Sequence, residues 1–507
     1  MPCLLALAVL GSLALPAAST AAGPRDMFPP EVMAKITDRS TLNPRVAAHL
    51  GWYDVYFDSE IGDAKWGDSE EPYEVHTGGT IRIHGYLAAP LFGGPYPGIV
   101  IGHGHGGTGA KELAIAVAAL GYVALSIDGP MAGESTGGPQ DTDQAWISVE
   151  ERFNEPSPTV GFLYHYAYAG MRAITLLDRL SRLPFNPLHI DRTRFGVIGA
   201  SMGGQFTYFL NAVDPRVKGA VAIAVAGDWR NLLFYEGSWL YHGLYYYTRD
   251  GLASGNDWLN AITNVCPGVR DPTLETFVAN FDPIAHAPTQ HGPLLTIIGT
   301  HDQYFTVPAI NTTYDRVASA GTNPRFIKRI MMTPNGKHGV IDENRLLRTV
   351  LPVLADIHNW FRYSFRSGAA PPATPTVRMS LKGDRMVFRV AAPAGSSSIR
   401  RVLLHWATQI DTRPESPCDF RTIQLKPVGG EYVGAVRLGA RPTCGPEATP
   451  ERVLYYASVK DAVAYTVSSK MYYGFSEMAF GSDFVPIIEH FPDDEFPVPP
   501  VPDCVPQ

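Results

Sequence analysis

The chain has no long apolar run and no excess of basic residues. No segment of its 507 residues approaches the roughly 20 consecutive apolar residues of a membrane-spanning helix, so we expect no integral membrane association. Its 41 Lys and Arg against 49 Asp and Glu give a net charge of −8, and no basic stretch could neutralise phosphates. We therefore expect no nucleic acid partner.

The N-terminus lacks a Lys or Arg ahead of its apolar segment at residues 4–15. That segment is too short to cross a bilayer comfortably, and Pro16 and a run of small residues follow it. This order is typical of a secretory signal peptide with cleavage near Ala21 or Ala22. We expect residues 1–22 to be a signal peptide and the mature protein to be secreted or periplasmic. The alternative is a weak signal or a wrongly assigned start.

Cysteine is scarce, with five residues in the chain. Apart from Cys3 there are four, and an even number in an exported protein indicates disulfides. We expect Cys418 to pair with Cys444 because both lie in one small region. Pairing of Cys266 with Cys504 is an open alternative. The cysteine spacings match no zinc site.

Strand and helix patterns alternate from residue 80 to residue 366. Such alternation predicts a mostly parallel sheet with helices on both faces. Beyond a Pro- and Ala-rich stretch the helical periods stop and short strand-like runs follow, which predicts a smaller antiparallel β-sandwich. We expect six parts: signal peptide 1–22, N-terminal arm 23–79, α/β domain 80–366, linker 367–376, β-sandwich domain 377–475 and extended tail 476–507.

The alternation lapses at residues 229–292, an insertion dense in Trp, Tyr and Phe. A long insertion at the functional edge of a sheet is where α/β enzymes carry lids and specificity walls. Aromatic ring faces suit an apolar or sugar-like ligand. The same rings could equally form the core of the insertion itself.

The strongest motif is Gly199-Ala200-Ser201-Met202-Gly203, which directly follows an apolar run at residues 195–198. A strand that ends in Gly-x-Ser-x-Gly and turns at once into a helix strains the serine backbone and exposes its hydroxyl as a nucleophile. The glycines avoid a clash where strand and helix nearly touch. A second match around Ser135 has no strand before it and no helix after it, so we interpret Ser135 as a loop serine.

A serine hydroxyl needs a base to take its proton, and the base needs a third group to fix its tautomer. In chain order the acid and then the histidine follow the serine, each after a strand. Asp302 follows the apolar run at residues 294–298, and His338 follows the run at 326–332. We favour these two. Asp228 also ends a strand and is the rival for the acid.

The glycine-rich run Gly102-His103-Gly104-His105-Gly106-Gly107 follows another short strand. Backbone N–H groups in such a loop can approach the negative oxygen of a tetrahedral intermediate without obstruction. We expect the N–H groups of His105 and Met202 to form the oxyanion hole. Metal ligation by His103 and His105 is the competing interpretation, but no further ligand lies at suitable spacing. We expect His103 to hold the loop by hydrogen bonds, and no metal or cofactor.

Several stretches together resemble α/β-hydrolases of the dienelactone hydrolase, acetyl xylan esterase and prolyl-oligopeptidase branch. They are residues 96–107 (YPGIVIGHGHGG), Asp128-Gly129-Pro130 with Gly133, residues 191–204, Gly299-x-x-Asp302 and His338-Gly339. The resemblance spans about residues 80 to 365 and implies the α/β-hydrolase fold without a metal. It implies Ser201, Asp302 and His338 as the triad, and the His103 loop as the oxyanion site.

The chain differs from prolyl oligopeptidases in lacking a long N-terminal propeller, and from dienelactone hydrolases in carrying serine rather than cysteine. We therefore expect a secreted carboxylic ester hydrolase that forms an acyl-enzyme on Ser201. Its substrate would be a small or polymeric ester. A peptidase or amidase is the second hypothesis. A catalytically silent binding protein on the same fold is the third.

Overall fold

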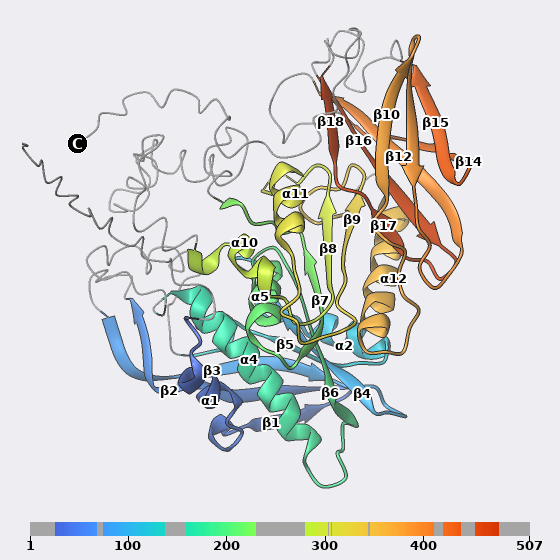
Figure 1. Ribbon diagram of the computed structural model, residues 1–507. Helices are drawn as coiled ribbons and strands as arrows, with labels where there is room; N and C mark the ends of the chain where they lie inside the picture. The colour runs from blue at the N-terminus through green and yellow to red at the C-terminus, as the bar shows by residue number, and fades with distance from the viewer. Residues whose placement is uncertain are drawn as a thin grey trace, which may run out of the picture.

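The computed structural model describes residues 26–67, 75–136, 159, 161–229, 279–302, 304–305, 307–342, 345–409, 419–437 and 452–475. Figure 1 shows a central sheet flanked by helices, with the C-terminal strands gathered at one end. Within the described residues, no helix is both long and apolar enough to cross a membrane. The predicted signal peptide, all five cysteines, most of the aromatic insertion and the C-terminal tail lie outside the described residues.

The central sheet has the strand order β1-β2-β3-β5-β4-β6-β7-β8-β9. Its first three strands are antiparallel, and β3 also pairs antiparallel with β5. From β5 to β9 every neighbouring pair is parallel. The strands are β1 (Arg45–His49), β2 (Trp52–Gly67), β3 (Val75–Ala88), β4 (Tyr96–Gly102), β5 (Val123–Ile127), β6 (Ile190–Ala200), β7 (Val217–Ile223), β8 (Leu294–Gly299) and β9 (Lys328–Thr333).

Helices cover both faces of this sheet (Figure 1). On one face α1 (Pro30–Thr37), α4 (Phe162–Ser181) and α5 (Met202–Val213) share a buried apolar cluster with Val100 of β4. On the other, α2 (Lys111–Ala119) and α12 (Leu346–Ser364) share a second cluster with Ile99 and Ile101. Successive strand residues point to opposite faces, so β4 is buried on both. This confirms the predicted α/β-hydrolase fold.

Shorter helices complete the α/β part of the chain. They are η1 (Ser40–Leu42), α10 (Pro283–His286), η3 (Ala287–Thr289) and α11 (Val307–Arg316). Asp282 caps α10, since its carboxylate accepts the N–H of Ile284 at 2.9 Å, and Pro283 occupies the first helical position.

The N-terminal arm differs from the expectation in one respect: residues 45–67 are themselves strands of the central sheet. The part before them docks on α4 through the fully buried Arg172. Its guanidinium donates to the backbone carbonyls of Lys35, Ile36, Asp38 and Asp58 at 2.6 to 3.2 Å. These carbonyls include the C-terminal end of α1, where helix carbonyls have no partner within the helix.

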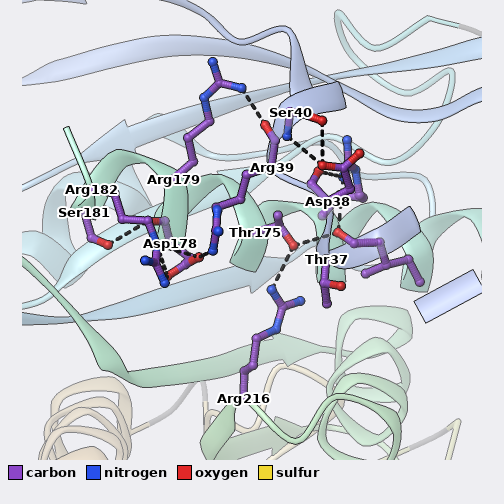
Figure 2. A network of polar contacts seen from close by, with 12 residues as sticks. Thr37, Asp38, Arg39, Ser40, Thr175, Asp178, Arg179, Ser181, Arg182 and Arg216 are labelled. Atoms are coloured by element: carbon purple, nitrogen blue, oxygen red, sulfur yellow. Dashed lines mark hydrogen bonds and ion pairs between the residues drawn. The ribbon is translucent and has the colours of Figure 1, made fainter. Parts of the chain in front are cut away.

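Figure 2 shows a further network of polar contacts between the arm and α4, with residues 37–40 of the arm near Asp178 and Arg179 of the helix. Asp178 of α4 accepts from Arg39 of the arm at 2.8 Å and from Arg182 one turn further along at 3.2 Å. Arg216 reaches Thr175 from the start of β7, at 2.8 Å. The arm is therefore held to α4 by polar contacts as well as by the apolar cluster.

The C-terminal strands are β10 (Thr376–Lys382), β11 (Arg385–Ala391), β12 (Ile399–Gln409), β13 (Arg421–Gln424), β14 (Lys426–Val428), β15 (Glu431–Arg437), β16 (Arg452–Asp461), β17 (Thr466–Ser468) and β18 (Tyr472–Phe475). We call residues 376–475 the C-terminal β region. Four of these strands form a separate antiparallel sheet in the order β10-β11-β15-β14. The others continue the central sheet, because β17 pairs with β9 at Ser468 and Ile330. The C-terminal β region is thus joined to the α/β sheet and not only tethered by a linker.

Candidate active site

Ser201 lies at the turn from β6 into α5 with φ +58° and ψ −122°. A positive φ is strained for a serine, and the turn is the strand-to-helix elbow that the motif predicts. The Ser201 N–H donates to the carbonyl of Ile223 at 2.9 Å, which ties the elbow to β7. A Cβ on Gly199 would overlap the carbonyl of Gly203, so the close approach requires glycine. Among the described residues, no group hydrogen-bonds the Ser201 hydroxyl in this state.

Asp302 and His338 form a hydrogen-bonded pair. Nδ1 of His338 lies 2.9 Å from Oδ2 and 3.1 Å from Oδ1 of Asp302. The carboxylate is buried, whereas 22% of the imidazole side chain is exposed. Because the carboxylate faces Nδ1, that nitrogen carries the proton and Nε2 is left as the base. The structure thus brings together the predicted acid and the predicted base.

Neighbouring groups fix both members of this pair. Oδ1 of Asp302 accepts the backbone N–H groups of Tyr304 at 2.8 Å and Phe305 at 3.0 Å. The rings of Tyr304 and Phe305 lie against the imidazole, with centroids 4.4 and 5.9 Å from it. The N–H of His301 donates to the carbonyl of Gly336 at 2.8 Å, which joins the loop of Asp302 to the loop of His338.

Asp228, the rival acid, lies five residues beyond the end of β7 with φ +63° and is half-buried. Within the described residues, the carboxylate that His338 contacts is that of Asp302. Next to Asp228 the buried Asp282 accepts the N–H of Trp229 at 2.7 Å. Burial raises the pKa of Asp282 to about 7. The sequence analysis did not identify Asp282, although the Asp-Pro pair at a helix start was its signal.

The glycine-rich loop lies directly against the elbow: a Cβ on Gly104 would be 3.5 Å from Cβ of Ser201. His103 fixes the loop as predicted. Its Nδ1 donates to the carbonyl of Gly104 at 2.8 Å, and its Nε2 accepts the N–H of Gly129 at 2.9 Å. Burial lowers the pKa of this imidazole. Both ring nitrogens are engaged with backbone groups, so His103 is not free to bind a metal.

Of the two predicted oxyanion donors, Met202 lies in the elbow and His105 lies on the glycine-rich loop. Met202 is the first residue of α5, where N–H groups have no partner within the helix. His105 is exposed on the loop, next to Gly104. Among the described residues, no group of three or more His, Cys, Asp or Glu side chains is placed to hold a metal.

A buried His–Asp pair holds the far end of the glycine-rich loop, and the sequence analysis missed it. Nδ1 of His84 lies 2.7 Å from Oδ2 of Asp128, whose Oδ1 accepts the N–H of Gly109 at 2.6 Å. On its other side His84 reaches Asp54 through Nε2 at 3.2 Å. The Ser135 hydroxyl accepts the N–H of His84 at 3.0 Å, so that serine has a structural role.

One family model matches the chain, over residues 165–421, with the description PhoPQ-activated pathogenicity-related protein. The match includes Ser201, Asp302 and His338. No curated protein matches the chain.

Three solved structures illustrate what the chain is similar to. Acetyl xylan esterase 1 from a Thermoanaerobacterium species is 17% identical with a TM-score of 0.43, over 63% of this chain and 90% of that one. An acetyl xylan esterase from a Paenibacillus species is 17% identical with a TM-score of 0.40, over 61% and 87%. The acylaminoacyl peptidase of Pyrococcus horikoshii is 17% identical with a TM-score of 0.39, over 64% and 42%.

Proposed function

We propose that this chain, which belongs to the family of PhoPQ-activated pathogenicity-related proteins, is a serine hydrolase that cleaves carboxylic esters through an acyl-enzyme. The observation that carries the proposal is the Asp302–His338 pair at the sheet edge where the strained Ser201 stands. A serine held at a costly φ, an oriented imidazole and a buried carboxylate are the three parts that nucleophilic acyl transfer needs.

The sheet supports the convergence of these residues. β6, β7, β8 and β9 run parallel, with Gly199 opposite Ala222, Ala222 opposite Thr296 and Thr296 opposite Ile330. Their carboxyl ends therefore meet one edge, with about 4.8 Å between neighbouring strands. Ser201, Asp302 and His338 all follow strand ends at that edge. Catalytic hydrogen bonds often tighten only when substrate binds, so we propose that the Ser201 hydroxyl turns toward Nε2 of His338 during turnover.

The proposed reaction uses these groups in order. The Ser201 hydroxyl oxygen attacks the ester carbonyl while its proton passes to Nε2 of His338, and Asp302 stabilises the imidazolium. His338 then gives this proton to the departing alcohol, and the acyl group stays on Ser201. Water attacks the acyl-enzyme, gives a proton to His338 and releases the acid, and the proton returns to Ser201.

The negative oxygen of each tetrahedral intermediate needs fixed donors about 3 Å away. We assign this role to the N–H groups of Met202 and His105. Met202 is suited to it because the N-terminus of α5 carries a partial positive charge. The His103 bonds to Gly104 and Gly129 keep the loop with His105 against the elbow.

We also propose that the protein is exported and that the C-terminal β region is a β-sandwich domain. Its two sheets share one buried apolar cluster, with Phe388 and Val390 from the separate sheet facing Leu404 and Tyr455 from the other. A peptidase or amidase remains the second candidate function, and a silent binding protein the third. The intact acid–base pair favours catalysis over the third.

The test is active-site labelling followed by rate measurements. A fluorophosphonate should label the wild-type protein and fail to label Ser201→Ala, which should lose about 10⁴-fold or more in kcat. Ser135→Ala is the matched control because Ser135 lies in the second Gly-x-Ser-x-Gly match, and it should still be labelled. The kcat/KM for p-nitrophenyl acetate should exceed that for an aminoacyl anilide. Labelling that persists in Ser201→Ala would refute the proposal, and the reverse order of rates would favour the peptidase.

A further inference from the structure

Asn335, on the loop that carries His338, is hydrogen-bonded to the C-terminal β region. Its Oδ1 accepts the backbone N–H of Phe420 at 2.6 Å, and its Nδ2 donates to the carbonyl of Phe420 at 3.4 Å. Phe420 stands just before β13, 85 residues further along the chain. The amide side chain of Asn335 therefore hydrogen-bonds both the N–H and the carbonyl of Phe420, a residue of the C-terminal β region. We call these two hydrogen bonds the clamp.

From these contacts we propose that Asn335 is a positioning residue for the catalytic base, and that the C-terminal β region serves the active site through it. This rests on the function proposed above, in which His338 is the base. The inference concerns how the imidazole is held, and assigns no substrate contact to the C-terminal β region.

The backbone of the loop supports this role. Asn335 has φ +60°, a left-handed conformation that asparagine and glycine adopt more readily than other residues. Its own N–H donates to the Thr300 hydroxyl at 2.8 Å, and Thr300 is two residues from Asp302. The Asn335 side chain thus faces the C-terminal β region while its backbone faces the loop that carries the acid. A shift of Asn335 would be transmitted to both members of the pair.

Phe420, the partner of Asn335, is packed into the C-terminal β region. Phe420 is buried, and its ring packs on Tyr456 of β16 and His301 with centroid distances of 5.7 and 6.0 Å. β16 pairs with both β12 and β17, and β17 pairs with β9, the strand that leads into the His338 loop. The Ser468 hydroxyl accepts the N–H of Met332 at 2.9 Å near the end of β9. The C-terminal β region is therefore hydrogen-bonded both to β9 and, through Phe420, to the His338 loop.

The test uses the full chain with Asn335→Gly. Glycine accepts the positive φ without strain, so this variant removes the clamp and leaves the turn possible. We expect kcat for p-nitrophenyl acetate to fall about 10- to 100-fold with KM changed less than about twofold, because a misplaced base slows the chemical step. Asn335→Asp keeps an acceptor for the Phe420 N–H and should restore most of kcat.

Asn311→Ala is the matched control. Asn311 of α11 forms the same two-bond clamp with Met471, donating to its carbonyl at 2.9 Å and accepting its N–H at 3.1 Å. Asn311 therefore also joins the α/β part of the chain to the C-terminal β region, but it does not lie on the His338 loop. Its loss should lower stability without lowering kcat.

A second measurement does not depend on turnover. The His338 Nδ1 proton bonded to Asp302 should give a low-field proton resonance, identified by its absence in His338→Gln. We expect Asn335→Gly to weaken or remove this resonance, and Asn311→Ala to keep it. A resonance and a kcat that are the same in Asn335→Gly as in the wild type would overturn the inference. If the wild type hydrolyses no ester, the proposed function fails, and the resonance still decides whether Asn335 holds the pair.

Discussion

Nδ1 of His84 and Oδ2 of Asp128 are 2.7 Å apart at a fully buried position, and the same carboxylate accepts the N–H of Gly109. The pair therefore anchors the end of the loop that carries His105. Burial alone would lower the pKa of His84, but its hydrogen bonds to Asp128 and Asp54 outweigh burial, and the pKa is raised. The imidazolium is the form that fits between these two carboxylates.

This pair predicts a pH dependence of stability. A histidine whose pKa is raised by folding stabilises the protein fully below its unfolded pKa of about 6.5, and this contribution is lost as pH rises through the folded pKa. We expect the free energy of unfolding to fall from pH 6 to pH 9, and His84→Gln to reduce that fall. Urea denaturation at several pH values measures it. Equal slopes in the two proteins would show that His84 is not responsible.

The sequence could predict the groups that follow strand ends, since each is read from a local pattern. Ser201 follows β6, and Asp302 and His338 follow β8 and β9, as expected from the apolar runs before them. The mostly parallel sheet was predictable for the same reason, because alternating strand and helix patterns specify it. The α/β-hydrolase fold itself was implied by the resemblance of the motifs to that family.

The supporting contacts could not be predicted, because their partners are remote in sequence. His84 and Asp128 are 44 residues apart, and Asn335 and Phe420 are 85 apart. No sequence motif that includes one of these residues indicates which residue it contacts. The continuation of the sheet from β9 into β17 was missed as well, since it depends on one short strand of three residues.

The buried carboxyl of Asp282, next to Asp228, predicts a pH dependence of stability on the acidic side of pH 7. Burial raises the pKa of Asp282 to about 7, so the folded protein binds a proton there that the unfolded chain releases near pH 4. The free energy of unfolding should therefore fall as pH rises from about 4 to about 7. Asp282→Asn should flatten this part of the curve. It should also lose about 1–3 kcal/mol near pH 4, because an amide nitrogen would face the N–H of Trp229 or Ile284. An unchanged slope would contradict the assignment.

Arg172 is expected to be the main polar anchor of the N-terminal arm. Arg172→Met would remove the charged donor shared by the carbonyls of Lys35, Ile36 and Asp38. Each carbonyl would keep one neutral donor, and the loss of several charge-assisted bonds should cost about 3 kcal/mol in unfolding free energy. Arg182→Ala is the matched control, because Arg182 is an exposed arginine at the C-cap of the same helix and pairs with Asp178 four residues before it (Figure 2). It should cost about 0.5 kcal/mol. Equal losses in the two variants would show that the buried guanidinium is not the anchor.

The acid of the triad is decided by two asparagine variants. Asp302→Asn keeps the shape of the side chain but cannot stabilise the His338 imidazolium, so we expect kcat for p-nitrophenyl acetate to fall about 10⁴-fold. Asp228→Asn should stay within about tenfold of the wild type, because His338 is hydrogen-bonded to Asp302. Thermal unfolding of both variants separates loss of catalysis from loss of fold. If Asp228→Asn alone were inactive while folded, the carboxylate that acts on His338 during turnover would be Asp228. The pair seen here would then have to rearrange when substrate binds.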